Sequence, residues 1–323
     1  MLAKVHRPDR DIRKPFTEIG DPDTYSGRTY DEKYITDFVI RYQLPCNITT
    51  AFLTPAFRTF NQALLPGTRL SGKPRKPYDA VLQLLQLVQN GTMDARTVLI
   101  EIVRQLILLR DERQQQINAL LQVGIQPHLL TVEAILDLIK EHLKAPRSSR
   151  LPVLIITAAY EVAQNHLGKR LRPLQPHTAA DTRTGTLGDL EIISQDSQQI
   201  TIVYEMKTRS VTYRDIENAR KKITNTSSQI DQYVFVTTAP IDAGVLMHAS
   251  MLTKQIGVEF MVLDCLEFIK HFLHLFYELR AKFLDRYQQL ILSEPESAVS
   301  YELKRKFLEL RNALAASRGS GSA

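Results

Sequence analysis

The chain is poor in the features that mark secreted, disulfide-rich and membrane proteins. Its 323 residues include two cysteines, Cys46 and Cys265, which are too few for a disulfide framework or a zinc cluster. No apolar run reaches the length of about eighteen residues that a membrane-spanning helix needs. The first residues are polar and lack the apolar segment of a secretory signal. We therefore expect a cytoplasmic protein that does not enter a membrane.

A strong excess of either charge is also missing. The chain has 41 basic and 35 acidic residues, a net charge of +6 and an isoelectric point near 9.2. This balance permits a polyanionic partner without requiring one. Basic residues cluster at 69–76, 169–172 and 220–222, and two of these clusters flank the polar segment 177–207. Each cluster taken alone is more typical of a solvated surface.

The length and composition predict two domains in an ordinary globular protein. Hydrophobic residues make up 44% of the chain and charged residues 24%. We expect a mostly helical region over residues 1–130 and an α/β domain with C-terminal helices over residues 131–318. The last residues, 319–323, read Gly-Ser-Gly-Ser-Ala and are expected to form a flexible tail.

Residues 1–130 carry mainly helical patterns. A polar lead-in over residues 1–29, which we expect to be extended, precedes helices that we predict at 31–42, 54–64, 79–89 and 94–123. In the last of these, apolar residues recur at spacings of three and four, as on one face of a helix. Asp94 is a suitable N-cap for that helix.

Residues 131–318 alternate helical and β-prone patterns. We predict helices at 132–144, 151–166, 215–223, 242–255, 265–292 and 298–316. We predict an antiparallel hairpin over 189–207 and single strands at 232–238 and 258–264. This order is typical of an α/β core (an α+β mixed sheet) with helices on its faces.

The segment 177–207 is the part of the chain that looks like a chemical site. A Gly-rich polar loop leads into the β-prone run 189–193. A polar turn at 194–199 separates this run from a second β-prone run at 200–207, and two such runs around a turn predict an antiparallel hairpin.

Charged side chains gather on one face of the predicted hairpin. Because side chains alternate along a strand, Glu205 and Lys207 share a face, while even-numbered residues 200–206 share the other. Asp189 and Glu191 lie together on the neighbouring strand. Charges at the ends of apolar runs are costly unless they pair or hold a metal ion, so this arrangement indicates a site.

The spacing of Glu205 and Lys207 is by itself a weak signal. The same spacing, with an acidic residue two positions before a lysine, also occurs at 31–33 and 302–304. Both places lie on predicted helices, where residues two positions apart do not face each other. A surface pair on an edge strand would explain the spacing equally well. The apolar residues around Glu205 and the α/β pattern that follows favour a functional site.

Asp189, and then Glu205-x-Lys207 on the second strand of a hairpin, resembles the motif of the PD-(D/E)xK nuclease superfamily. Gly188 stands where that motif has its proline. Glu161, the one carboxylate on a strongly apolar predicted helix, occupies the place of an acidic residue that such families contribute before the hairpin. The stretch 150–207 further resembles type II restriction endonucleases of the SacI-like family.

The resemblance implies a restriction-endonuclease-like core and Mg²⁺-dependent cleavage of a phosphodiester bond. Carboxylates that hold Mg²⁺ supply Lewis acidity and an activated water. Asp189 and Glu205 are the expected ligands, with the Met206 backbone carbonyl as a third. Lys207 is expected to orient the water or stabilise the developing charge. Glu161 is expected to be an auxiliary catalytic residue.

Glu191 shares the face of Asp189 and has two possible roles. It is an alternate metal ligand or, as we favour, a residue that faces solvent or a structural partner. The spacing leaves both open.

Contacts with DNA phosphates are expected from side chains near the hairpin and in the basic loop before residue 77. The expected residues are Arg183, Thr184, Arg209, Lys73, Arg75 and Lys76. Such contacts position a duplex without reading its sequence. The loop sequence matches part of the nucleotide-binding P-loop motif. Pro74, however, stands where that motif has a hydroxyl that binds Mg²⁺, which argues against nucleotide hydrolysis. A solvated loop is the alternative.

The resemblance implies a type II restriction endonuclease that makes double-strand breaks at a specific sequence. The helical region 1–130 would then serve DNA binding, specificity or dimerisation. A homodimer is expected, because two-fold symmetry matches a palindromic site, together with a companion DNA methyltransferase. The alternatives are a repair or structure-specific nuclease of the same superfamily and a non-catalytic DNA-binding protein.

Overall fold

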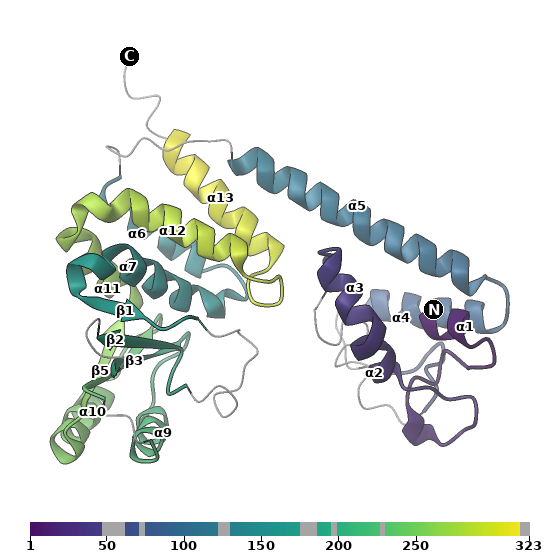
Figure 1. Cartoon of the computed structure of the whole chain (residues 1–323), viewed down its shortest axis with the longest axis horizontal. Helices are drawn as coiled ribbons and strands as arrows, with labels where there is room; N and C mark the ends of the chain where they lie inside the picture. The colour runs from purple at the N-terminus through teal and green to yellow at the C-terminus, as the bar shows by residue number, and fades with distance from the viewer. Residues whose placement is uncertain are drawn as a thin grey trace. The chain divides into compact units, whose positions relative to one another are not determined.

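A computed structural model of the chain describes residues 1–46, 62–70, 75–121, 130–174, 186–194, 199–226 and 230–316 (Figure 1). It divides into two compact units, Met1–Gln116 and Ile117–Ala323. Among the described helices, none combines the length and the apolar content needed to cross a lipid bilayer.

The first unit is helical in its described residues. Its elements are α1 (Leu2–His6), η1 (Thr17–Ile19), α2 (Gly27–Tyr30), η2 (Asp31–Ile35), α3 (Thr36–Arg41), α4 (Arg75–Gln89) and most of α5 (Ala95–Leu121). Asp94 accepts hydrogen bonds from the backbone and hydroxyl of Thr97, as its predicted capping role requires.

Three expectations for this unit need correction or lie outside the described residues. The lead-in 1–29 is not wholly extended, because α1, η1 and α2 fall within it. Helix α4 starts at Arg75, within the predicted loop. The helix predicted at 54–64 lies outside the described residues except for 62–64, which are not helical.

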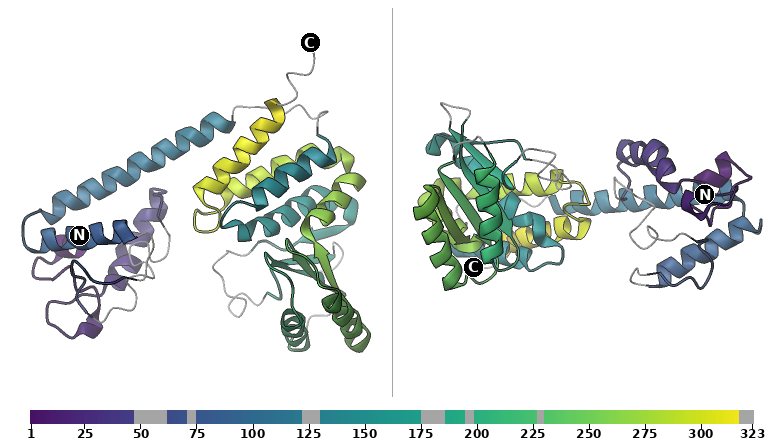
Figure 2. Two further views of the ribbon diagram at one scale, coloured as in Figure 1. Left: turned by 180° about the vertical axis from the view of Figure 1, so that it is seen from behind. Right: turned by 90° about the horizontal axis from the view of Figure 1, so that it is seen from below.

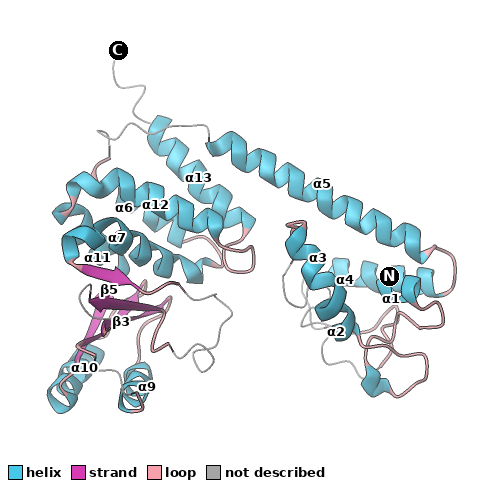
Figure 3. Ribbon diagram, in the orientation of Figure 1, coloured by secondary structure: helices cyan, strands magenta, loops and turns pink. Residues whose placement is uncertain are grey.

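The described strands of the second unit form one mixed five-stranded sheet in the order β1-β2-β3-β4-β5 (Figure 3). The strands are β1 (Lys169–Leu171), β2 (Leu190–Ser194), β3 (Ile200–Lys207), β4 (Gln232–Thr237) and β5 (Glu259–Asp264). Strands β1, β2 and β3 pair antiparallel, and β3, β4 and β5 pair parallel. The predicted hairpin and mixed α/β sheet are therefore confirmed, while the short edge strand β1 was not predicted.

Helices cover both faces of this sheet (Figures 1 and 2). The hydrophobic cluster on one face includes α6 (Val132–Leu143), α7 (Leu151–Leu167), α11 (Cys265–Leu275), α12 (Arg280–Ser293) and α13 (Tyr301–Ala316). Helices α7 and α11 contact strands of the sheet, whereas α12 packs on α7 and α13 packs on α6. The other face packs on α9 (Tyr213–Thr224) and α10 (Ala243–Ile256). Each face therefore has its own hydrophobic cluster, with helices on both sides of the sheet.

A β-bulge changes the alternation at the start of β3. Ile193 pairs with Ile200 and Ile192 pairs with Ile202, so Thr201 is the extra residue. Ile200 consequently packs in the α9–α10 cluster, although simple alternation predicted it on the face of Ile202. After the bulge the predicted alternation holds, with Tyr204 on the α7 side and Val203 on the α9 side.

The helix predicted at 265–292 is broken. Phe276 has φ −112° and ψ 55°, which ends α11, and η5 (Tyr277–Leu279) leads into α12. The Arg280 guanidinium donates to the carbonyl of Leu273 at 3.0 Å and satisfies one group of the broken end. The break brings the rings of Phe272 and Phe283 within 5.9 Å of each other. Core packing therefore overrides a helical pattern that contains no glycine or proline.

Buried His142 joins three helices of the second unit. Its Nε2 lies 3.1 Å from the carbonyl oxygen of Leu303, which can only accept, so Nε2 carries the proton. Nδ1 therefore accepts from the Tyr287 hydroxyl at 3.0 Å. Burial lowers the pKa of His142 to about 4, against the opposing effect of the Leu303 carbonyl. The imidazole is neutral in the folded protein at pH 7.

Stability of the second unit is expected to fall as the pH drops from about 6.5 to about 4. In this window the unfolded chain binds a proton at His142 that the folded chain does not bind. Between pH 7.5 and pH 5 the loss amounts to about 2 kcal/mol. Hydrogen exchange of the α6 and α12 amides, followed by mass spectrometry, measures it. His142→Asn should remove this part of the pH dependence, whereas His271→Gln, at an exposed position, should retain it.

Candidate catalytic site at the carboxyl end of strand β3

Glu205 and Lys207 lie at the carboxyl end of β3, a central strand of the sheet. Strand β3 is paired on one side with β2 and on the other with β4. The surface pair on an edge strand, the simplest alternative to a site, is therefore contradicted. Parallel strands β3, β4 and β5 end at the same edge, and in open α/β sheets ligands bind outside such carboxyl ends.

Asp189 is held against the same end of β3 from the neighbouring strand. Its backbone N–H donates to the Tyr204 carbonyl at 2.8 Å, which continues the β2–β3 pairing by one residue. Its carboxylate Oδ2 accepts from the backbone N–H of Met206 at 2.7 Å. The Asp189 carboxylate therefore lies beside β3 between the positions of Glu205 and Lys207.

The direction of the Met206 carbonyl follows from the hydrogen bonds on either side of it. The carbonyl of Tyr204 faces β2, where Asp189 donates to it. The carbonyl of Lys207 faces β4, where it accepts from the Thr238 N–H at 3.2 Å. Carbonyls alternate in direction along a strand, so the Met206 carbonyl faces the side of β2 and Asp189.

Gly188 allows β2 to approach β3 closely. A Cβ at this position would lie 2.6 Å from the Tyr204 carbonyl oxygen and 2.6 Å from Cγ1 of Val203. Any side chain here would push the start of β2 away from β3. The close approach gives a physical reason for glycine at a position where the motif has proline.

Three donors hold the Glu205 carboxylate. Lys207 Nζ lies 2.6 Å from Oε1, the Tyr233 hydroxyl donates to Oε2, and Lys222 Nζ lies 3.4 Å from Oε2. Tyr233 is fully buried, and its hydroxyl oxygen also lies 3.0 Å from the carbonyl oxygen of Leu187; its single proton is directed to the closer Glu205 oxygen. The carboxylate is thus fixed from β3, β4 and α9.

Its surroundings keep Glu205 ionised. Burial alone would raise the pKa of this carboxyl, since only 16% of the side chain is exposed. Hydrogen bonds from Lys207 and Tyr233, and the charges of Lys222 and Lys207, outweigh burial and hold the pKa below its usual value. A charged carboxylate at neutral pH is what a cation ligand requires.

Neither Tyr233 nor Lys222 was identified from the sequence. Tyr233 stands opposite Val203 in the β3–β4 register, on the face of Glu205. Lys222 belongs to the basic cluster 220–222 on α9. The period-two pattern of β4 shows which face Tyr233 takes, but its contact with Glu205 depends on a strand register that no local pattern specifies.

Arg209, an expected DNA contact, forms a two-point ion pair with Asp215. Both guanidinium–carboxylate distances are 2.7 Å, and the hydrogen bonds from Arg209 hold the pKa of Asp215 far below its usual value. Asp215 also completes the capping box of α9 with Thr212. Arg209 is 57% exposed, so it anchors the start of α9 with a guanidinium that solvent reaches.

Glu161 does not share the described contacts of the hairpin carboxylates. Its two oxygens accept from Arg286 Nε at 2.6 Å and Nη2 at 3.1 Å. It lies on α7, which packs on the face of Tyr204, whereas Glu205 faces α9. Its neighbour Tyr160 is the residue that reaches the sheet, through a 2.6 Å hydrogen bond with Tyr204.

Glu191 is a buried structural carboxylate. Its side chain is 2% exposed and pairs with Arg172 at 2.6 Å. Its other oxygen accepts from the backbone N–H of Leu187 at 2.8 Å. These contacts support the structural role that we favoured and tie edge strand β1 to the loop before β2.

The other expected DNA contacts are placed only in part. Arg183, Thr184 and Lys73 lie outside the described residues. Arg75 and Lys76 are exposed in the first turn of α4, in the first unit.

The donors at the end of β3 suit a hard cation. Within the described ranges, no three His, Cys, Asp or Glu side chains gather into a metal-holding group. Mg²⁺ does not need such a group, because it commonly takes one or two carboxylates and keeps several waters. Asp189, Glu205 and the Met206 carbonyl supply only oxygen ligands. This set therefore fits Mg²⁺.

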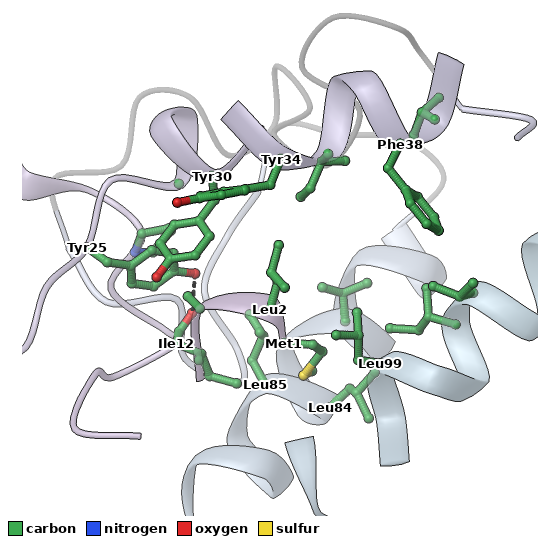
Figure 4. A pocket seen from close by; sticks show the side chains of 18 of the residues that line it. Met1, Leu2, Ile12, Tyr25, Tyr30, Tyr34, Phe38, Leu84, Leu85 and Leu99 are labelled. Atoms are coloured by element: carbon green, nitrogen blue, oxygen red, sulfur yellow. Dashed lines mark hydrogen bonds between the residues drawn. The ribbon is translucent and has the colours of Figure 1, made fainter. Parts of the chain in front are cut away.

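The first unit contains a cavity of a different character (Figure 4). It measures about 730 Å³ and is lined almost wholly by apolar and aromatic side chains, among them Tyr30, Tyr34, Phe38 and Leu84. Among the described residues its lining includes no carboxylate, histidine or lysine side chain. This lining therefore lacks the carboxylate ligands that Mg²⁺ takes, and the end of β3 remains the candidate catalytic site.

No protein-family model matches the chain, and no curated protein matches it.

Gly188→Ala is expected to destabilise the second unit by about 1–3 kcal/mol through overpacking. Chemical unfolding followed by circular dichroism measures the change. Gly168→Asn is the matched control, because Gly168 has open space around it and a φ of +62°, which asparagine tolerates. Equal losses of stability in the two variants would contradict the close approach at Gly188.

Proposed function

We propose that the chain is a Mg²⁺-dependent nuclease that hydrolyses phosphodiester bonds of DNA. The observation that carries the proposal is the meeting of Asp189, Glu205 and Lys207 at one end of β3. Two carboxylates, a backbone carbonyl and an ammonium group suit the hydrolysis of an anionic phosphodiester. The similarity of these residues to the PD-(D/E)xK motif supports the same activity.

Each side chain has a defined task in the proposed reaction. Asp189, Glu205 and the Met206 carbonyl would hold Mg²⁺, which when bound supplies Lewis acidity and lowers the pKa of water. Tyr233 keeps the Glu205 carboxylate in place. Lys207 orients the attacking water or stabilises charge on the phosphate.

Within this activity we propose the restriction type, a type II site-specific deoxyribonuclease with a restriction-endonuclease-like core. The separate helical unit supports this choice, since a sequence-specific enzyme needs a surface that reads bases. Cutting both strands of a palindromic site calls for a homodimer whose two-fold axis matches that of the DNA. A companion methyltransferase would protect the sites of the host.

Asp189→Asn and Lys207→Met are expected to lower DNA cleavage about a hundredfold or more, because each removes charge stabilisation at the reacting phosphate. The assay is Mg²⁺-dependent cleavage of phage and plasmid DNA, with chelator as the blank. Discrete fragments indicate the restriction type, and structure-dependent nicking indicates a repair nuclease. Binding without cleavage by the wild type would leave a DNA-binding protein.

Glu161→Gln is the matched control. It removes a carboxylate of the same unit whose described partner is Arg286, so we expect it to retain cleavage within a few-fold of the wild type. A loss as large as that of Asp189→Asn would instead assign Glu161 the auxiliary catalytic role that the resemblance implies.

A further inference from the structure

Lys222 approaches the candidate site from a helix that the motif does not include. It lies on α9, and its Nζ is 3.4 Å from both Glu205 Oε2 and the Leu187 carbonyl oxygen. Lys207 Nζ is much closer to Glu205, at 2.6 Å. Contacts of 3.4 Å are at the weak limit of hydrogen bonding. Lys222 is also the more exposed of the two lysines, at 32% against 22%.

We propose that Lys222 is a second cationic residue of this site, which neutralises Glu205 before a divalent ion binds and contacts a substrate phosphate oxygen afterwards. The inference rests on the proposed nuclease function. It assigns a role to a residue outside the Asp–Glu–Lys motif.

Charge balance is the first reason to expect that Lys222 changes its partner from Glu205 to a phosphate oxygen when the ion binds. Asp189 and Glu205 contribute two negative charges, and Lys207 and Lys222 contribute two positive ones. A divalent ion at the carboxylates would leave this group with a net charge of +2 and would repel the ammonium that shares Glu205 Oε2. An incoming phosphodiester restores the balance.

The second reason is that Lys222 shares a carboxylate oxygen with the expected ion. Its Nζ contacts Glu205 Oε2, and its flexible four-carbon stem permits the ammonium to shift without moving α9. Tyr233 is neutral, so it does not oppose the ion and continues to hold Glu205. Lys222 therefore competes with the ion more than Tyr233 does.

The basic end of α9 favours a phosphate as the new partner of Lys222. Lys221 and Lys222 lie in the last turn of the helix, and Lys221 is exposed. Arg220 is partly engaged in an ion pair with Glu217 at 2.8 Å. Of the described lysines of α9, Lys222 is the one with a contact to Glu205, so a phosphodiester oxygen near Glu205 would be within reach of Lys222 rather than of Lys221.

The test compares Lys222→Met with Lys221→Met. Both variants remove one positive charge from the last turn of α9, but only the first removes a charge next to Glu205. Titration calorimetry with Mn²⁺, without DNA, measures affinity for the ion. Lys222→Met is expected to bind Mn²⁺ about three- to tenfold more tightly than the wild type because a competing charge is gone. Lys221→Met should remain within about twofold of it.

The rate of DNA cleavage is a second measurement, and Lys222→Met should lower it although the same variant binds Mn²⁺ more tightly. At saturating Mn²⁺, Lys222→Met should cut DNA about tenfold or more slowly, because a phosphate contact is lost. Lys222→Arg, which keeps the charge, should restore Mn²⁺ affinity to that of the wild type. Tighter ion binding with slower cleavage would not result from a purely structural role. Lys222→Gln replaces Lys222→Met if circular dichroism shows that the methionine variant is unfolded.

The outcomes separate this inference from the proposed function. Unchanged or weaker Mn²⁺ binding by Lys222→Met overturns the inference, and so does tighter binding with unchanged cleavage. If Asp189→Asn binds Mn²⁺ as the wild type does, the ion does not bind at this site and the proposed function fails. If Asp189→Asn loses Mn²⁺ but Lys222→Met behaves like Lys221→Met, the function stands and only the inference fails.

Discussion

A charged carboxylate in a largely buried position governs the end of β3. Burial has removed most of the water from the Glu205 carboxylate, so protein donors must supply its hydrogen bonds. Burying this charge without a partner would cost on the order of several kcal/mol. Lys207, Tyr233 and Lys222 supply these donors from β3, β4 and α9. Strand order, strand register and helix position must all be correct for this carboxylate to be satisfied.

The antiparallel pairing of β2 with β3 imposes a second constraint. It places the Asp189 carboxylate where it accepts a hydrogen bond from the Met206 N–H. This N–H lies beyond the last residue pair of β2 and β3, Leu190 with Tyr204. Gly188 permits the required close approach, and the bulge at Thr201 adjusts the register before the strand reaches the site. Glu191, held by Arg172 and the Leu187 N–H, fixes the loop that delivers Gly188 and Asp189.

Local patterns predicted the elements of the site but not its contacts. Period-two alternation was sufficient for β3, whose bounds, Ile200–Lys207, match the prediction, and for the shared face of Glu205 and Lys207. The contact between Tyr233 and Glu205 depends on a parallel register between strands separated by α9. The break at Phe276 comes from ring packing in the core, which leaves no mark in a helical pattern. The three-residue strand β1 is too short for alternation to be recognised.

The balance of charge at the end of β3 distinguishes this group from a simple structural ion pair and supports the proposed catalytic role. A single lysine would satisfy Glu205, and Lys207 already lies 2.6 Å from it. A buried tyrosine hydroxyl and a second lysine on the same carboxylate exceed what pairing alone requires. With Asp189 beside them, the two carboxylates and two ammonium groups are neutral together. Such a group would bind a divalent cation more tightly when an anion binds with it, and a phosphodiester would bring that negative charge to the cation.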